Sequence, residues 1–171
     1  MATSIVHGKY LISKVTDTGE AVVVENGAVF QRDGTIAEIG SYEVLSVKYR
    51  ADETIGSVDH VVMPGFVNAY HHVGVTPFQL GAPDAPLELW TVFRSGARDV
   101  DVYLDTLYSA FEMIESGVTT VQHLHGVRRG PVTGWPHLAQ QVLQAYRDIG
   151  MRVSYAFGMR DQNRLVYGAD D

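Results

Sequence analysis

The spacing of hydrophobic and polar positions divides the chain at about residue 62. Before it, short apolar segments alternate with polar turn residues, and both Asn26-Gly27 and Asp33-Gly34 have the composition of hairpin turns. We expect one helical turn over residues 41–45 and an irregular polar segment over residues 46–57. Residues 1–62 therefore predict a small antiparallel β module that is too small to fold alone.

After residue 62 the apolar positions follow an alternation of strands and helices. The stretch Val61–His72 begins with a strand; further strands are predicted over residues 118–121 and 152–157, and helices over 86–97, 101–116 and 136–149. One of these helices has an apolar stripe made of Leu104, Leu107, Phe111 and Ile114. The order predicts right-handed βαβ units with a parallel sheet.

The number of predicted strands is small for the architecture that this order favours. A closed eight-stranded α/β barrel needs about 200 residues or more, whereas 109 of the 171 residues follow residue 62. We therefore expect the N-terminal portion of a larger enzyme: a piece of a longer chain, a cleavage product or one chain of a split enzyme. The alternative is a complete three-stranded α/β domain.

Composition narrows the possible partners and locations. The chain is 46% hydrophobic and 19% charged, enough to bury a core, and its net charge of −7 argues against binding to nucleic acid or to an anionic membrane. It has no cysteine, which excludes thiolate metal ligands from this chain. The first residues lack a signal-peptide pattern, and no window approaches the roughly 18 apolar residues of a membrane span. We expect a cytoplasmic protein.

Polar side chains gather where the predicted strands end. The three groups are Tyr70, His71 and His72; Gln122, His123 and His125; and Arg160, Asp161, Gln162 and Asn163. In parallel α/β sheets, functional groups lie beyond the carboxyl ends of the strands. This convergence predicts a site at that edge of the sheet.

Tyr70 and His72 are the first candidates, because residues i and i+2 of a strand share one side. His72 is predicted as a metal ligand, and the alternative is a hydrogen-bonded histidine in a cleft. Tyr70 is predicted as a catalytic residue and a second metal ligand, bound as a phenolate; the alternatives are that it donates a hydrogen bond to substrate or fills space. His71 is expected to point elsewhere.

The second and third strand ends add candidates for substrate contact. His123 and His125 repeat the i, i+2 spacing and are predicted to bind substrate; they could also complete a metal site or lie in the core as satisfied polar groups. Arg160 is predicted as a catalytic residue that holds a carbonyl or carboxylate. The alternative for Arg160 is a pair with Asp161 that fixes the loop.

The loop and helix after the first strand carry large apolar side chains. Among them, Phe78 and Trp90 are predicted to form an apolar wall suited to an aromatic or alkyl substrate. The alternative is ordinary packing of the loop against the helix.

Three motifs occur in order along the chain: DGTIAEIG at Asp33–Gly40, VMPGFVNA at Val62–Ala69 and ESGVTTV at Glu115–Val121. Together they resemble the metal-dependent amidohydrolase superfamily, and its cytosine deaminase and triazine hydrolase-like subset in particular. The resemblance implies an α/β fold in which residues 1–62 form part of a small β-sandwich. Residues 63–171 then form the first three β/α units of a (β/α)8 TIM-type barrel.

The resemblance also implies one divalent metal ion, zinc or iron, that activates water. The first-strand motif of the family is His-x-His; its second histidine matches His72, whereas Tyr70 stands in place of the first. The remaining family ligands come from later strands, beyond Asp171. Subgroups with an altered first motif include hydrolases of phenylureas and thiocarbamates.

The predicted function is metal-dependent hydrolysis of a C–N bond (amide, urea or carbamate-like) in a small, partly apolar or aromatic substrate. The rest of the barrel is expected from the same gene product or from a second chain, so this chain alone is expected to be inactive. We also expect a homo-oligomer. Two alternatives are a non-catalytic relative used for binding or assembly and a deaminase of a heteroaromatic amine.

Overall fold

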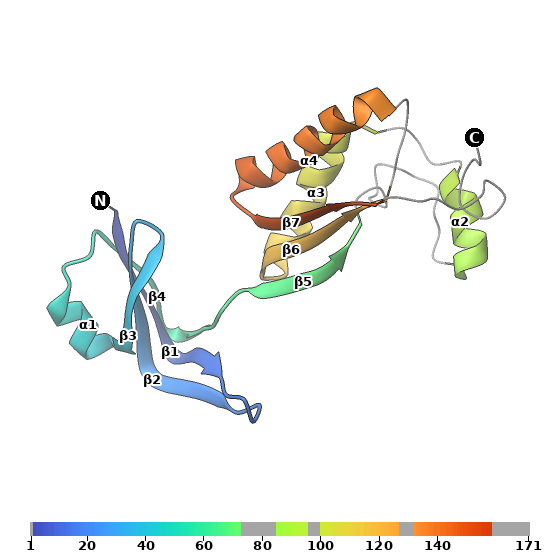
Figure 1. The fold of residues 1–171 in the computed structure, drawn as a ribbon. Helices are drawn as coiled ribbons and strands as arrows, with labels where there is room; N and C mark the ends of the chain where they lie inside the picture. Colours follow the sequence, from blue (N-terminus) through green and yellow to red (C-terminus); the bar gives the residue numbers. More distant parts are fainter. Residues whose placement is uncertain (1, 73–84, 96–99, 127–131, 159–171) are drawn as a thin grey trace. The chain divides into compact units, whose positions relative to one another are not determined.

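The computed structural model describes residues 2–72, 85–95, 100–126 and 132–158 (Figure 1). The chain divides into two compact units, Met1–Pro64 and Gly65–Asp171. Phe78 and Arg160, two of the predicted site residues, lie outside the described residues. Within the described segments, no helix combines the length and the apolar character that a membrane span requires.

The first unit contains a four-stranded sheet and a short helix. The elements are β1 (Thr3–Val15), β2 (Ala21–Arg32), β3 (Thr35–Ser41), α1 (Tyr42–Lys48) and β4 (Glu53–Val62), with the strand order β3-β2-β1-β4. β1 and β3 pair antiparallel with β2, but β4 joins β1 in parallel. The antiparallel prediction is confirmed for β1, β2 and β3 but was wrong for β4. The irregular segment predicted over residues 46–57 was also wrong, because α1 reaches Lys48 and β4 begins at Glu53.

The two glycine dipeptides of this unit differ in their roles. Asp33 and Gly34, with φ of 50° and 78°, join β2 to β3 in a two-residue turn and confirm that prediction. Asn26, with φ of 46°, lies inside β2, so the hairpin predicted there was wrong. A Cβ atom on Gly27 would lie 2.5 Å from the Cβ of Leu11. Close approach of two strands, not a turn, explains this glycine.

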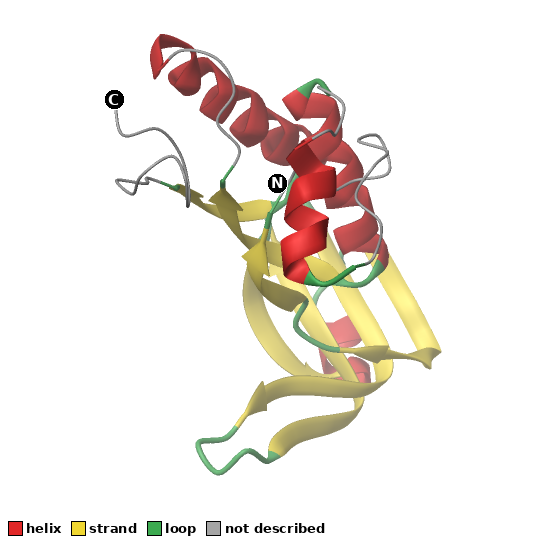
Figure 2. Ribbon diagram, turned by 90° about the vertical axis from the view of Figure 1, so that its right-hand side faces the viewer, coloured by secondary structure: helices red, strands yellow, loops and turns green. Residues whose placement is uncertain are grey.

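The second unit is a parallel three-stranded sheet with helices. Its elements are β5 (Phe66–His71), α2 (Leu87–Ser95), α3 (Val102–Glu115), β6 (Val118–His125), α4 (Trp135–Ile149) and β7 (Arg152–Phe157), with a 3-10 turn at Val132–Gly134. The strand order is β5-β6-β7, and both pairings are parallel, as predicted. Figures 1 and 2 show α3 and α4 on the same side of this sheet. The mixed α/β class is therefore confirmed.

The core of the second unit lies between this sheet and the two helices. Its buried residues are Ala110 and Met113 of α3, Val121 of β6, Val142 and Tyr146 of α4, and Met151. Val121 shows which side of β6 faces the helices. Since β6 side chains alternate, His123 and His125 are expected on the same side as Val121.

The helix α3 turns small and polar side chains toward this core. Its buried residues are Asp105, Thr106, Ser109, Ala110 and Met113. Three residues of the predicted apolar stripe are more than two-fifths exposed: Leu104, Phe111 and Ile114. The helix itself was predicted correctly. Its inward side could not be predicted from apolar spacing, because small side chains let the helix pack closely on the sheet.

Candidate site at the carboxyl end of β5

Tyr70 and His72 lie together at the carboxyl end of β5. The hydroxyl oxygen of Tyr70 is 2.8 Å from Nε2 of His72, and their rings meet edge to face with centroids 4.7 Å apart. Nδ1 of His72 is 2.7 Å from the carbonyl oxygen of Leu124 on β6. A carbonyl oxygen only accepts, so Nδ1–H donates to it, and in the neutral ring Nε2 accepts from the Tyr70 hydroxyl.

The approach of β5 to β6 explains the Pro-Gly pair before this site. A Cβ atom on Gly65 would lie 2.3 Å from side-chain atoms of Thr119 on β6. Only glycine leaves room for Thr119 at this point. The close approach of β5 to β6 at this point therefore requires glycine at position 65.

His71 points away from the Tyr70–His72 pair. Its ring meets that of His123 edge to face, with centroids 5.8 Å apart. Burial, with His72 as a smaller cause, holds the pKa of His71 below its usual value. Nε2 of His71 is buried and has no hydrogen-bond partner among the described residues.

His123 and His125 are buried on the helix side of β6. His123 is 0% exposed, and its Nδ1 forms a hydrogen bond of 3.0 Å with the Tyr146 hydroxyl of α4. Burial lowers the pKa of His123 to about 3, and the neighbouring histidines add smaller contributions. The His125 ring stacks on Phe157 at 5.1 Å between centroids. Both histidines are held by aromatic packing; their contact with substrate remains a prediction.

Aromatic side chains of β7 complete this buried layer. The Tyr155 ring lies 5.3 Å from that of His123 between centroids. Burial raises the pKa of Tyr155 to about 12, so its hydroxyl stays protonated at neutral pH.

Trp90, the remaining predicted substrate contact that the structure describes, is half-buried in α2.

Metal binding by the residues at this site stays a prediction. Among the described residues, no three His, Asp or Glu side chains converge on one point. Tyr70 and His72 offer two donor atoms 2.8 Å apart. A metal-binding histidine usually donates its other N–H to a carbonyl or carboxylate, as His72 does toward Leu124. The geometry of Tyr70 and His72 is compatible with two ligands of one metal ion.

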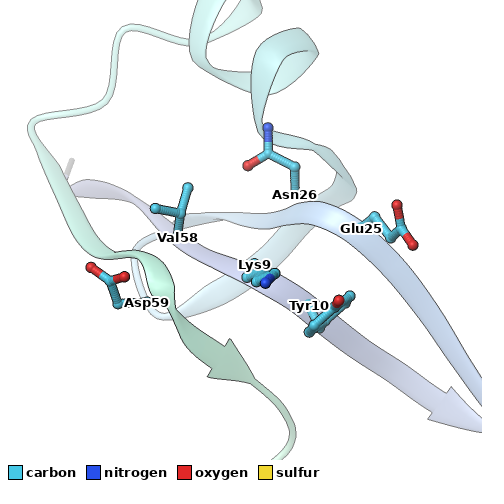
Figure 3. A pocket seen from close by; sticks show the side chains of 6 residues that line it. All are labelled: Lys9, Tyr10, Glu25, Asn26, Val58 and Asp59. Atoms are coloured by element: carbon cyan, nitrogen blue, oxygen red, sulfur yellow. The ribbon is translucent and has the colours of Figure 1, made fainter.

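A separate hollow of about 480 Å³ lies in the first unit (Figure 3). It is lined by Lys9, Tyr10, Glu25, Asn26, Val58 and Asp59. The β1–β4 register explains it: between Gly8 and Tyr10 of β1, β4 advances from Ser57 to Val61, so its extra residues leave the ladder. None of its lining residues was predicted from the sequence, because the hollow arises from a register shift.

Comparison with known proteins identifies the family of this chain. No protein-family model matches the chain. A 5'-deoxyadenosine deaminase of Methanosarcina barkeri is 34% identical over 176 aligned positions, which cover 100% of this chain and 37% of that protein. The homologues of this chain are deaminases and hydrolases of the metal-dependent amidohydrolase superfamily. This chain therefore belongs to the metal-dependent amidohydrolase superfamily, as the resemblance indicated.

Solved amidohydrolase structures share the fold. A triazine hydrolase from Arthrobacter aurescens has a TM-score of 0.72 and 17% identity, over 96% of this chain and 37% of its own. An adenosine deaminase from Xanthomonas campestris with bound zinc has a TM-score of 0.68 and 21% identity, over 99% of this chain and 37% of its own. The chain thus spans about a quarter to little more than a third of the length of the curated relatives that it matches.

Proposed function

We propose that this chain is the amino-terminal part of a metal-dependent hydrolase that breaks C–N bonds. The structural observation that carries the proposal is His72, whose Nδ1–H is held by the Leu124 carbonyl and whose Nε2 faces an exposed strand end. In that orientation Nε2 is the atom that could bind a metal ion once the Tyr70 hydroxyl moves away. The homology to deaminases and hydrolases supplies the reaction class.

Among hydrolytic reactions, we favour deamination of an amino-substituted heteroaromatic ring. Water would replace the amino group on a ring carbon, and ammonia would leave. Support comes from the names of the relatives, which include 5'-deoxyadenosine and adenosine deaminases. The triazine hydrolase among the fold neighbours keeps the broader class of amide, urea and carbamate-like substrates open.

Tyr70 and His72 are the proposed ligands from this chain. A bound divalent ion, zinc in the proposal, would lower the pKa of a water molecule toward neutrality and thereby supply the nucleophile. To bind through Nε2, His72 has to lose the hydrogen bond from the Tyr70 hydroxyl. Tyr70 then either ligates as a phenolate or turns its hydroxyl toward substrate. The Leu124 carbonyl keeps the His72 ring fixed in both cases.

The remaining parts of the proposal concern the whole protein. We propose that β5, β6 and β7 are the first strands of a (β/α)8 barrel and that residues 1–62 belong to a β-sandwich, supported by the likeness to triazine hydrolase. The rest of the barrel would come from the same gene product or a second chain. Substrate contacts by His123, His125, Phe78, Trp90 and Arg160 stay predictions.

The decisive experiment measures metal and ammonia on the protein together with whatever completes its barrel. Intact mass and identification of co-purifying chains establish the assembly. We expect about one zinc per active site and release of ammonia from an adenosine-like substrate, with both lost in His72→Ala. A larger amine released from a urea or amide panel would instead favour the broader hydrolase class.

A non-catalytic relative is the second candidate. The observation that favours it is the hydrogen bond between the Tyr70 hydroxyl and Nε2 of His72. A protein that uses this fold for binding or assembly would keep that hydrogen bond permanently. Absence of stoichiometric metal and of hydrolysis across the panel, in the complete assembly, would support this candidate and reject the enzyme.

A further inference from the structure

The pairing of β5 with β6 shifts register twice. From Phe66 to Val67 one step along β5 matches two along β6, and between Asn68 and His71 β5 has one extra residue. Asn68 pairs with Val121, and His71 pairs with His123. Three steps along β5 thus match two along β6, and neither Ala69 nor Tyr70 has a partner in the register. This is a β-bulge, a feature that re-aims side chains and is common beside functional sites.

The bulge decides which side of the sheet Tyr70 occupies. Asn68 faces the helices, since its Nδ2 is 3.6 Å from the sulfur of Met113 on α3. In a regular strand, residue 70 would share that side and residue 71 would take the other. The structure shows the reverse: His71 lies against buried His123, and Tyr70 is 69% exposed.

Asn68 stabilises the bulge through its side chain. Its Oδ1 accepts a hydrogen bond of 3.2 Å from the backbone N–H of Tyr70. This bond satisfies a donor that has left the ladder, as asparagine side chains do two residues ahead in Asx turns. The contact with Met113 holds the same side chain from its other end.

We propose that Asn68 is a positioning residue that turns Tyr70 outward to meet His72. It does not touch substrate or metal in this role; it acts by fixing the backbone of Tyr70. The role in catalysis rests on the proposed function of the Tyr70–His72 pair, but the geometry can be tested without it. The sequence offered a signal for this residue only as part of the VMPGFVNA motif.

The test uses metal-free, isotope-labelled protein and the nitrogen resonances of the His72 ring. Loss of the Tyr70 hydroxyl in Tyr70→Phe gives the reference for an unbonded Nε2. We expect Asn68→Ala to move the Nε2 resonance most of the way to that reference. Asn68→Asp keeps an oxygen acceptor for the Tyr70 N–H and should retain the native resonance.

Met113→Leu is the matched control for a merely structural effect. It removes the contact to Nδ2 of Asn68 but leaves the Tyr70 N–H bond, so stability falls while the His72 resonance stays native. A folded Asn68→Ala variant with a native His72 spectrum would overturn the proposal. If that variant does not fold, the test is made on the wild-type protein by NMR. A scalar coupling across the hydrogen bond, between the Tyr70 amide nitrogen and the Asn68 side-chain carbonyl carbon, supports the proposal, and its absence overturns it.

These measurements separate the two hypotheses. Asn68→Ala can shift the His72 resonance in a protein that binds no metal, in which case the positioning role stands and the hydrolase proposal fails. Conversely, zinc-dependent deamination together with a His72 spectrum that Asn68→Ala leaves unchanged would support the proposed function and contradict the positioning role of Asn68.

Discussion

At the scale of single residues, Tyr70 forms a hydrogen bond with the ring nitrogen of His72 that the proposed metal would need. Its hydroxyl occupies Nε2, the same atom that a metal would need. A phenol must lose its proton to become a good ligand, whereas a neutral imidazole binds metal through a lone pair that it already has. In the proposed metal site, tyrosine at position 70 would therefore bind the metal more weakly at neutral pH than a histidine would, while still offering a second donor atom.

Tyr70→His is expected to tighten zinc binding to the complete protein about tenfold at pH 7, on the order of 1.4 kcal/mol. The reason is that no proton has to leave the new ligand. Competition with a chromophoric chelator measures the affinity. Tyr70→Phe removes the donor and should weaken binding; equal affinities in all three proteins would show that residue 70 is not a ligand.

His123 links stability to pH because it is buried. Its pKa is about 3 in the folded protein against 6.5 as the usual value, so the unfolded chain takes up its proton first as pH falls. This contribution to stability is complete above pH 6.5 and is lost progressively toward pH 3, at up to about 1.4 kcal/mol per pH unit.

Urea unfolding of the metal-free protein at pH 7 and pH 5 measures this effect. We expect the wild type to lose on the order of 1–2 kcal/mol more than His123→Gln over that interval. Glutamine can keep a hydrogen bond to Tyr146 but does not titrate. The same pH dependence in both proteins would mean that His123 is not the group responsible.

At the scale of elements, sequence patterns predicted the existence of strands and helices better than their contacts. The Asp33-Gly34 turn needed only local backbone preferences, and it was predicted correctly. The hairpin predicted at Asn26-Gly27 was wrong. Asn26 lies inside β2, where its side chain forms hydrogen bonds with His7 of β1 and Glu43 of α1. The bulge at Asn68 involves Met113, which is 45 residues away in the sequence, so no local pattern could reveal it.

The same limit applies to the candidate site. The i, i+2 rule brought Tyr70 and His72 together in the prediction, and the structure has them in contact. The partner that orients His72, the Leu124 carbonyl, is a backbone atom on another strand and leaves no signal in the sequence. Phe78 and Arg160 lie outside the described residues, so their predicted roles stay predictions.

The contact between β5 and β6 can be tested at Gly65. Gly65→Ala would place its Cβ 2.3 Å from the Thr119 side chain, and β-branched threonine cannot easily move aside. We expect a loss of about 1–3 kcal/mol in the free energy of unfolding, measured by urea titration. In a Thr119→Gly protein, Gly65→Ala should lower the free energy of unfolding by less than it does in the wild type. A simply additive double mutant would contradict this contact.

At the scale of the whole molecule, the chain spans 37% of the relatives compared with it. The described residues hold two donors at one strand end, and a catalytic zinc site usually takes three protein ligands. The proposed metal would therefore join β5 to distant parts of the fold. Its binding should stabilise the complete protein as a unit.

Zinc at 100 times its dissociation constant should stabilise the complete protein by about 2.7 kcal/mol, because it binds the folded state. Thermal unfolding with zinc and with a chelator measures the shift in Tm. His72→Ala should show a much smaller shift, whereas a substitution on the exposed side of α3, such as Leu104→Gln, should keep it. An equal shift in His72→Ala would place the zinc elsewhere.

The extra residue in β5 has a consequence for the length of this segment in evolution. Deleting Ala69 would leave Asn68, Tyr70, His71 and His72 as consecutive residues of a regular strand, and each side chain would keep its present direction. We therefore expect the Ala69 deletion to preserve the His72 ring spectrum while making Asn68 replaceable by alanine. A relative one residue shorter here could present the same pair of side chains, and an alignment that ignores the insertion would match the wrong residue to Tyr70.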